Sequence, residues 1–209
     1  MIVLKFGGTS VGSVENFRKV ADIVNQVRED KIVVLSAMSG VTNTLVEISD
    51  HLKTGNKERA IFVIGSLDQK YREVARDLLP DHGMQEKAID FLETHNALLK
   101  SIATEGFTES SEKEILAQGE LVSTRLFQYY MESIHVSSEL LSAIDFMRID
   151  RNGEPEAERI QQNLRKVLHS DSGNRTYITQ GYICRNHLNE IDNLRRGGSD
   201  YSASLIGAA

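Results

Sequence analysis

The chain has 209 residues, of which 40% are hydrophobic and 26% are charged, as in an ordinary globular domain. Its net charge of 24 − 30 = −6 disfavours nonspecific nucleic-acid binding, and no apolar run approaches the length of a membrane span. The single cysteine, Cys184, excludes an internal disulfide framework, and with His187 alone it does not make a zinc site. We therefore expect a cytoplasmic domain with no nucleic-acid or membrane partner and no metal site built from its own side chains.

The first part of the chain alternates strand-like and helix-like segments. Residues 2–4 form a short apolar run that ends at a glycine pair, which predicts a buried strand entering a turn. Ser13 can cap a following amphipathic helix, and residues 32–35 predict a second strand, again followed by small residues. Strand, helix and strand in this order predict a parallel sheet with crossover helices.

The middle of the chain is predicted to be helical. Apolar residues with a 3.6-residue period predict one helix from about residue 61 to Pro80 and a second over residues 89–103. The turn between them makes the two helices an antiparallel pair. Ser111 with Glu114 has the spacing of a capping box, which predicts a third helix that runs to about Met131.

The last third of the chain is predicted to return to strands. Residues 136–141 and 143–149 look strand-like, and Pro155 opens a helix to about residue 168. Residues 176–183 predict a strand that pairs with residues 190–194 across a polar turn. Residues 199–209 begin a helix without an end signal, so we expect the chain to be a fragment of a longer protein.

A glycine-rich segment, Lys5 to Gly12, joins the first strand to the first helix. Glycines let backbone amides approach an anion closely, and a helix N-terminus adds favourable partial charge. Lys5 supplies a mobile positive charge, which makes the segment a candidate phosphate cradle. Its spacing fits neither a Walker A loop nor a dinucleotide fingerprint, and a tight strand-to-helix turn explains the same composition equally well.

A second loop of small and hydroxyl-bearing residues, 36–43, follows the second strand. Ligands collect at the carboxyl ends of parallel strands, so the two loops point to one shared crevice. The alternative is an ordinary helix cap by Ser39 or Thr42.

The third predicted helix carries Glu120 on a partly apolar face, where an unpartnered carboxylate is costly. There it is a candidate acceptor for a ligand ammonium group, and a glutamate at the solvent edge is the alternative. The neighbouring Gly119 costs the helix about 1 kcal/mol relative to alanine. That cost suggests close approach of a ligand or of another backbone segment.

The segment Leu194 to Tyr201 is predicted to be a loop before the last helix. Arginine can bind a carboxylate with two hydrogen bonds, and Ser199 and Asp200 lie where a helix N-terminus offers free amides. A plain turn with Asp200 as the capping acid is the alternative. Together, the four segments suit transfer of a phosphoryl group onto an amino acid.

Five segments resemble the aspartate kinase family in order and approximate spacing. They are KFGGTSVG at 5–12, VVLSAMSGVTN at 33–43, AQGELVS at 117–123, TQGYICRN at 179–186 and RGGSDYSASL at 196–205. The resemblance implies a three-layer α/β/α sandwich of the amino-acid kinase type, with a mainly parallel, incomplete sheet. It implies that residues 1–209 are the amino-terminal, amino-acid-binding part of the catalytic domain, without its nucleotide-binding half and regulatory domains. Arg195 and Cys184 depart from the family pattern, because both stand where glycine is usual.

The resemblance also implies roles for individual residues. Lys5 and Asp200 would be catalytic, with Lys5 stabilising the transferring phosphoryl group and Asp200 orienting this lysine. The ATP-binding residues would be Lys5, Gly7, Gly8 and Ser10. The aspartate-binding residues would be Ser36, Thr42, Glu120, Arg196 and Ser199, with Arg196 on a substrate carboxylate and Glu120 on the ammonium group.

The implied reaction uses ATP and Mg²⁺ to phosphorylate the side-chain carboxylate of L-aspartate, the first step of lysine, threonine and methionine biosynthesis. A carboxylate is already ionised at neutral pH, so catalysis needs alignment and charge neutralisation rather than a general base. We expect a homo-oligomer for the full-length protein and an inactive fragment for this chain. The alternatives are another amino-acid kinase or a non-catalytic amino-acid-binding module, although a module that only binds would not need Lys5 beside Asp200.

Overall fold

The computed structural model describes residues 1–168, 174–195 and 197–209. The chain opens with β1 (Ile2–Phe6), α1 (Val14–Gln26), β2 (Lys31–Leu35) and α2 (Val41–Lys53). Three long helices follow: α3 (Lys57–Leu78), α4 (His82–Glu105) and α5 (Glu109–Ser133). The last elements are β3 (Glu139–Leu141), α6 (Ala143–Phe146), α7 (Ala157–Val167), β4 (Thr176–Gln180), β5 (Ile183–Arg185), β6 (Ile191–Asn193) and α8 (Gly198–Ala208).

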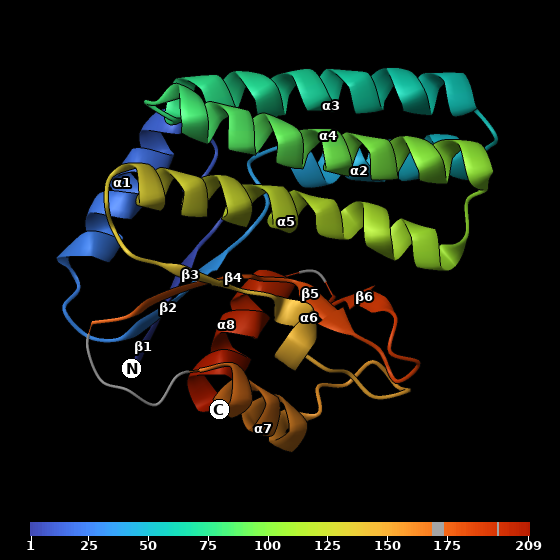
Figure 1. The fold of residues 1–209 in the computed structure, drawn as a ribbon. Coiled ribbons are helices and arrows are strands. Elements are labelled where there is room, and N and C mark those ends of the chain that lie inside the picture. Colours follow the sequence, from blue (N-terminus) through green and yellow to red (C-terminus); the bar gives the residue numbers. More distant parts are fainter. Residues whose placement is uncertain (169–173, 196) are drawn as a thin grey trace.

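The main sheet has the strand order β1-β2-β4-β3, and every pair in it is parallel (Figure 1). The predicted parallel sheet is thus confirmed, and the sheet is open rather than closed into a barrel. The predicted pairing of residues 176–183 with 190–194 is wrong in part. That segment divides at Gly181 and Tyr182: β4 joins the main sheet, and only β5 pairs with β6 as a separate antiparallel hairpin.

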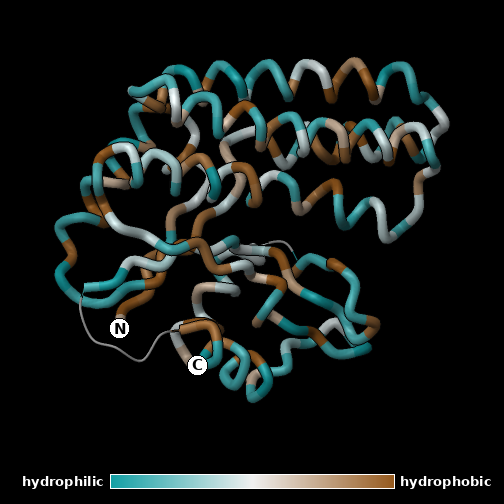
Figure 2. Tube along the Cα trace, viewed as in Figure 1, coloured by the Kyte–Doolittle hydropathy of each residue, from teal (hydrophilic) through white to brown (hydrophobic). Residues whose placement is uncertain are grey.

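Helices cover both faces of the sheet, with α1 to α5 on one side and α6 to α8 on the other (Figure 1). The alternation of side chains along β2 divides the core: Val33 and Leu35 pack with the first group of helices, and Ile32 and Val34 with the second. Figure 2 shows hydrophobic residues along these central strands. The three-layer α/β/α prediction is therefore confirmed. Within the described residues, no helix is both long and apolar enough for a transmembrane span.

The helical layer follows the sequence signals closely. The Ser13 side chain accepts a hydrogen bond of 3.2 Å from the amide of Asn16, so the predicted cap of α1 is confirmed. The helices α3 and α4 form the predicted pair. The predicted capping box of the third helix is wrong, because the N-cap of α5 lies three residues before Ser111. Thr108 caps it and accepts a 3.1 Å hydrogen bond from the amide of Ser111.

The predicted strand over residues 143–149 is also wrong, since its first half is the single helical turn α6. The amide of Ala143 donates a 2.9 Å hydrogen bond to the buried side chain of Gln180, which holds the start of this turn against β4. The turn buries Ala143 and Phe146 in the second core. A short apolar run does not distinguish these two structures by its period alone.

Gly119 allows α5 to approach the loop after β2 closely. A Cβ atom at this position would lie 2.7 Å from Ala37 Cβ and 3.2 Å from Leu45 Cδ1. The expected close approach is therefore made by the protein's own chain. It brings the following residue, Glu120, to the carboxyl ends of the strands.

We predict that Gly119→Ala lowers the free energy of unfolding by roughly 1–3 kcal/mol, because the added methyl group is forced against Ala37. Gly65→Ala is the matched control, since Gly65 lies exposed within α3 and a Cβ atom there would meet no neighbouring side chain within 4 Å. The control variant should gain about 0.5–1 kcal/mol from helix propensity alone. Urea unfolding of both variants checks this, and equal gains in the two would contradict the packing argument.

Candidate functional site

A cavity of about 540 Å³ lies at the carboxyl ends of β1, β2 and β4. It is bordered by Lys5 on β1, the loop of residues 36–40, Glu120 on α5, Tyr182 after β4, and the first residues of α8. Residues from all four of the segments singled out in the sequence thus lie around one cavity. Arg196, which belongs to the last of them, lies outside the described residues.

Lys5 and Asp200 form an ion pair that joins the first strand to the last helix. The Nζ atom of Lys5 lies 2.7 Å from Oδ1 of Asp200, and the side chains are 23% and 75% exposed. Exposed ion pairs add little to stability, so this one is better suited to hold a charged group in place than to stabilise the fold. A Cβ atom at Gly7 would lie 3.3 Å from the same Nζ atom, so glycine there leaves room for the ammonium group.

Two helices begin at the cavity without side-chain caps. The N-cap residues of α2 and α8 are Gly40 and Gly197, both with φ of 80°, a left-handed conformation that favours glycine. Capping of α2 by Ser39 or Thr42, and of α8 by Asp200, is therefore wrong. Both helix N-termini border the cavity with amides that no side chain caps, an arrangement that suits an anion.

Glu120 is a buried acid on the cavity wall. It is only 4% exposed, so the alternative of a solvent-edge glutamate is wrong. Burial raises the pKa of its carboxyl to about 7, and a hydrogen bond from the backbone of Ala37 opposes the rise. Its Oε2 atom has no hydrogen-bond partner within the described residues. A buried carboxylate in this state would be stabilised by a cationic group from a ligand.

The remaining residues with expected roles divide into two groups. Gly8, Ser36, Thr42 and Ser199 border the cavity. Gly7 and Ser10 lie in the turn behind it, where the amide of Ser10 donates a 2.9 Å hydrogen bond to the carbonyl of Gly7. A Cβ atom at Gly8 would lie 2.9 Å from the carbonyl oxygen of Ala37, so this glycine lets the first loop pack on the second.

Tyr182 is a cavity residue for which the sequence predicted no role. Its φ of 68° is unusual for a residue with a side chain, and its amide donates a 2.9 Å hydrogen bond to Ser202 Oγ. Burial, together with the nearby charge of Glu120, raises the pKa of its hydroxyl to about 12. The sequence signal that could have identified Tyr182 is its place beside Gly181, directly after a buried strand.

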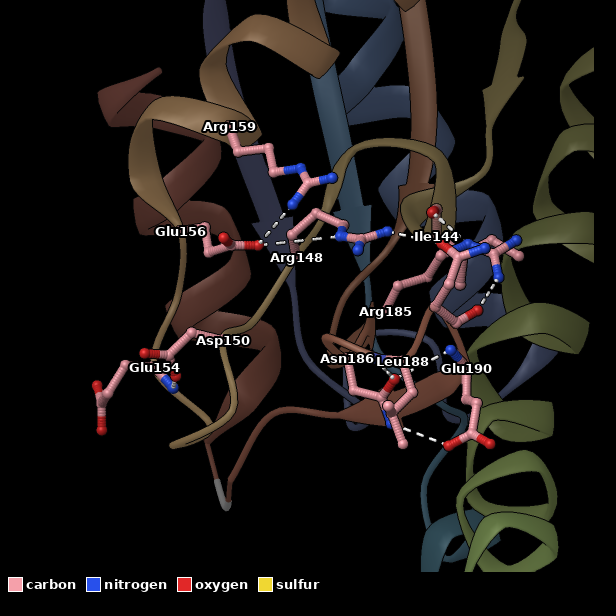
Figure 3. A network of polar contacts seen from close by, with 11 residues as sticks. Ile144, Arg148, Asp150, Glu154, Glu156, Arg159, Arg185, Asn186, Leu188 and Glu190 are labelled. Atoms are coloured by element: carbon pink, nitrogen blue, oxygen red, sulfur yellow. Dashed lines mark hydrogen bonds and ion pairs between the residues drawn. The ribbon is translucent and has the colours of Figure 1, made fainter.

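A polar network fixes the β5–β6 hairpin that follows Tyr182 (Figure 3). Arg185 donates to the carbonyl of Ile144 at 3.0 Å and to the carbonyl of Asn189 at 2.7 Å. Arg148 donates to the side chain of Asn189 at 2.7 Å. These bonds join the hairpin to the segment around α6. Residues that do not line the cavity therefore fix the position of the hairpin next to Tyr182.

Residues 1–209 match the model of the Amino acid kinase family, and the chain belongs to this family. It is 31% identical to Lysine-sensitive aspartokinase 3 of Escherichia coli K12, covering 100% of this chain and 46% of that protein. It is 30% identical to Aspartokinase of Chlamydia muridarum, covering 99% of this chain and 45% of that protein. The chain thus spans about half the length of the curated relatives it matches.

Solved structures of E. coli aspartokinase III have the same fold. The complex with aspartate and ADP, described as the R-state, matches with a TM-score of 0.78 and 29% identity. The complex with lysine and aspartate, described as the T-state, matches with a TM-score of 0.77 and 30% identity. Each match covers 99% of this chain and 46% of the solved chain.

We predict that Glu120→Gln stabilises the protein increasingly as the pH rises above about 4.5. The folded-state pKa of about 7 lies above the ordinary value of 4.5, so the folded state binds the proton more tightly than the unfolded state. The parent protein therefore loses stability as the pH rises from about 4.5 through 7, by up to roughly 3 kcal/mol. The variant avoids this loss, so its advantage should be large at about pH 8 and absent near pH 4. Denaturant unfolding across this range measures it, and an advantage independent of pH would contradict a raised pKa.

Proposed function

We propose that this chain is the amino-acid-binding part of an aspartate kinase catalytic domain. The proposed reaction transfers the γ-phosphoryl group of ATP to the side-chain carboxylate of L-aspartate, giving 4-phospho-L-aspartate and ADP. The observation that carries the proposal is the Lys5–Asp200 ion pair in the same cavity as Glu120, whose Oε2 atom has no hydrogen-bond partner within the described residues. The similarity to aspartokinases along the whole chain supports this substrate.

Aspartate offers groups that match the charges of the cavity. Its ammonium group would supply the missing partner of Glu120. The amides at the starts of α2 and α8, together with Ser36, Thr42 and Ser199, provide hydrogen-bond donors for carboxylates. Arg196 would bind a carboxylate as well. A glutamate buried at this point favours an amino acid over a simple dicarboxylate.

The chemical step needs little from the protein beyond position and charge. An oxygen of the substrate carboxylate attacks the γ-phosphorus of ATP, and the bond from that phosphorus to the bridging oxygen breaks to release ADP. Lys5 neutralises the negative charge that spreads over the transferring group, and Asp200 holds the lysine in place. The turn of Gly7, Gly8 and Ser10 would lie along the ATP phosphates, with the rest of the nucleotide site in the remaining part of the catalytic domain.

We expect Mg²⁺ to bind mainly to the phosphate oxygens of ATP, with few ligands from the protein. No group of three or more candidate ligands occurs within the described residues. Mg²⁺ commonly takes one or two carboxylates together with phosphate oxygens and water, and the exposed carboxylate of Asp200 fits this use. When bound, the ion would neutralise phosphate charge beside Lys5. A cytoplasmic homo-oligomer remains our expectation for the full-length protein.

We predict that two substitutions have separable kinetic effects in the full-length parent protein. Lys5→Ala should lower kcat by about 10²–10³-fold with a small change in KM, because its charge counts most in the transition state. Glu120→Gln should mainly raise the KM for aspartate, because it weakens ammonium binding. A coupled assay of ADP release measures both, and Lys19→Ala, at an exposed pair on α1, is the control. An unchanged kcat for Lys5→Ala would refute its phosphoryl role.

The choice of substrate is tested with aspartate, glutamate and N-acetylglutamate in the same assay. N-acetylglutamate has no ammonium group, so the parent protein should reject it, as Glu120 requires a cation. Preference for glutamate would indicate another amino-acid kinase. Binding of aspartate without any turnover by the full-length protein would instead indicate a non-catalytic binding module.

A further inference from the structure

A second cavity, of about 290 Å³, lies on the other side of α5, between α4, α5 and the adjoining strands β3 and β4. Its walls include the apolar side chains of Phe91, Leu121 and Leu140. Its polar lining includes His95, Gln118 and Arg125. None of these residues borders the first cavity, and the proposed function does not use them.

The polar floor of this second cavity is neutral and fixed. His95 and Gln118 are each 5% exposed, and Nδ1 of the histidine lies 3.0 Å from Oε1 of the glutamine. The glutamine in turn donates a 3.0 Å hydrogen bond to the carbonyl of Glu114. Burial lowers the pKa of His95, which keeps its ring uncharged at neutral pH. The floor therefore presents no charge to a ligand.

Arg125 is the charged group that lines this second cavity, and it has no counter-charge among the described residues. Its Nη1 donates a 2.8 Å hydrogen bond to the neutral side-chain amide of Gln128. Its guanidinium carbon lies 5.7 Å from the ring centre of Phe91 and 5.8 Å from that of Tyr129. The two rings hold a half-buried cation beside an apolar hollow, with donors left over for an anion.

We propose that this second cavity binds a small carboxylic acid with an apolar body, of the aryl or branched-alkyl class. The apolar part would lie against Phe91, Leu121 and Leu140, and the carboxylate would pair with Arg125. The volume suits a ligand of this size, because a hollow of about 150 Å³ already accommodates benzene. A few polar groups in a mostly apolar pocket are also the usual composition of small-molecule sites.

The test uses phenylpropanoate as the probe and its uncharged amide, phenylpropanamide, as the matched ligand. Calorimetric titration should show binding of phenylpropanoate at least about tenfold tighter than that of the amide. Arg125→Gln should remove this preference by weakening phenylpropanoate binding about tenfold. Arg59→Gln is the control variant. The guanidinium carbon of Arg59 also lies over an aromatic ring, 4.9 Å from the ring centre of Phe62, but Arg59 does not line this cavity. The affinity of this control variant for phenylpropanoate should equal that of the unsubstituted protein.

Two further measurements keep the test decisive. Leu98→Trp, at a residue 39% exposed on the rim, should block the cavity and abolish binding even if Arg125→Gln does not fold. Saturating L-aspartate should leave phenylpropanoate binding unchanged, and this control is needed because the probe is a carboxylate and the first cavity also suits anions. Isocaproate, a branched-alkyl acid, is titrated as a second probe. Displacement by aspartate, equal affinity of phenylpropanoate and its amide, or no binding of either phenylpropanoate or isocaproate would overturn the proposal.

Discussion

The parallel register of three strands determines where everything else in the candidate site can lie. Phe6 pairs with Leu35, and Leu35 pairs with Gln180, so β1, β2 and β4 end at the same level of the sheet. Residues that leave these strands must therefore meet at one edge, however far apart they are in the sequence. The remaining contribution comes from α8, which packs against β1 and brings Asp200 to Lys5. Loops after parallel strands are a recurrent place for ligands for this geometric reason.

The helix α5 adds to this edge a buried acidic side chain, that of Glu120, whose burial costs stability. A buried carboxylate with one oxygen unpartnered reduces stability, and close contacts on either side of Glu120 hold it in the interior. Gly119 gives up helix propensity so that α5 can approach Ala37, and Ser123 donates a 2.8 Å hydrogen bond to the carbonyl of Ser36. Both contacts fix α5 to the loop after β2. The protein without ligand thus carries a cost in stability that a bound cation would offset.

The three-layer arrangement was implied by the resemblance to the aspartate kinase family. The sequence itself predicted the parallel sheet and the meeting of Lys5, Glu120 and Asp200, because apolar periods and strand ends are local signals. It failed where the outcome depends on distant contacts. The turn α6 exists because Gln180 binds the amide of Ala143, a contact across 37 residues. Tyr182 was given no role, because its left-handed backbone is unusual and its amide bonds to Ser202, a residue 20 positions away. The raised pKa of Glu120 likewise required knowledge of its burial, since spacing allowed an exposed position equally well.

The two cavities are separated by one helix, and the helical period explains why they have opposite chemistry. Successive residues of α5 turn by about 100°, so Glu120 and Ser123 face the loop after β2 while Gln118, Leu121 and Arg125 face α4. One face supplies a carboxyl group to the first cavity, and the other supplies a guanidinium group to the second. A ligand on the α4 side could alter the first cavity by displacing α5. The close contact at Gly119 and the hydrogen bond from Ser123 oppose that displacement, so the geometry favours two sites that are filled independently.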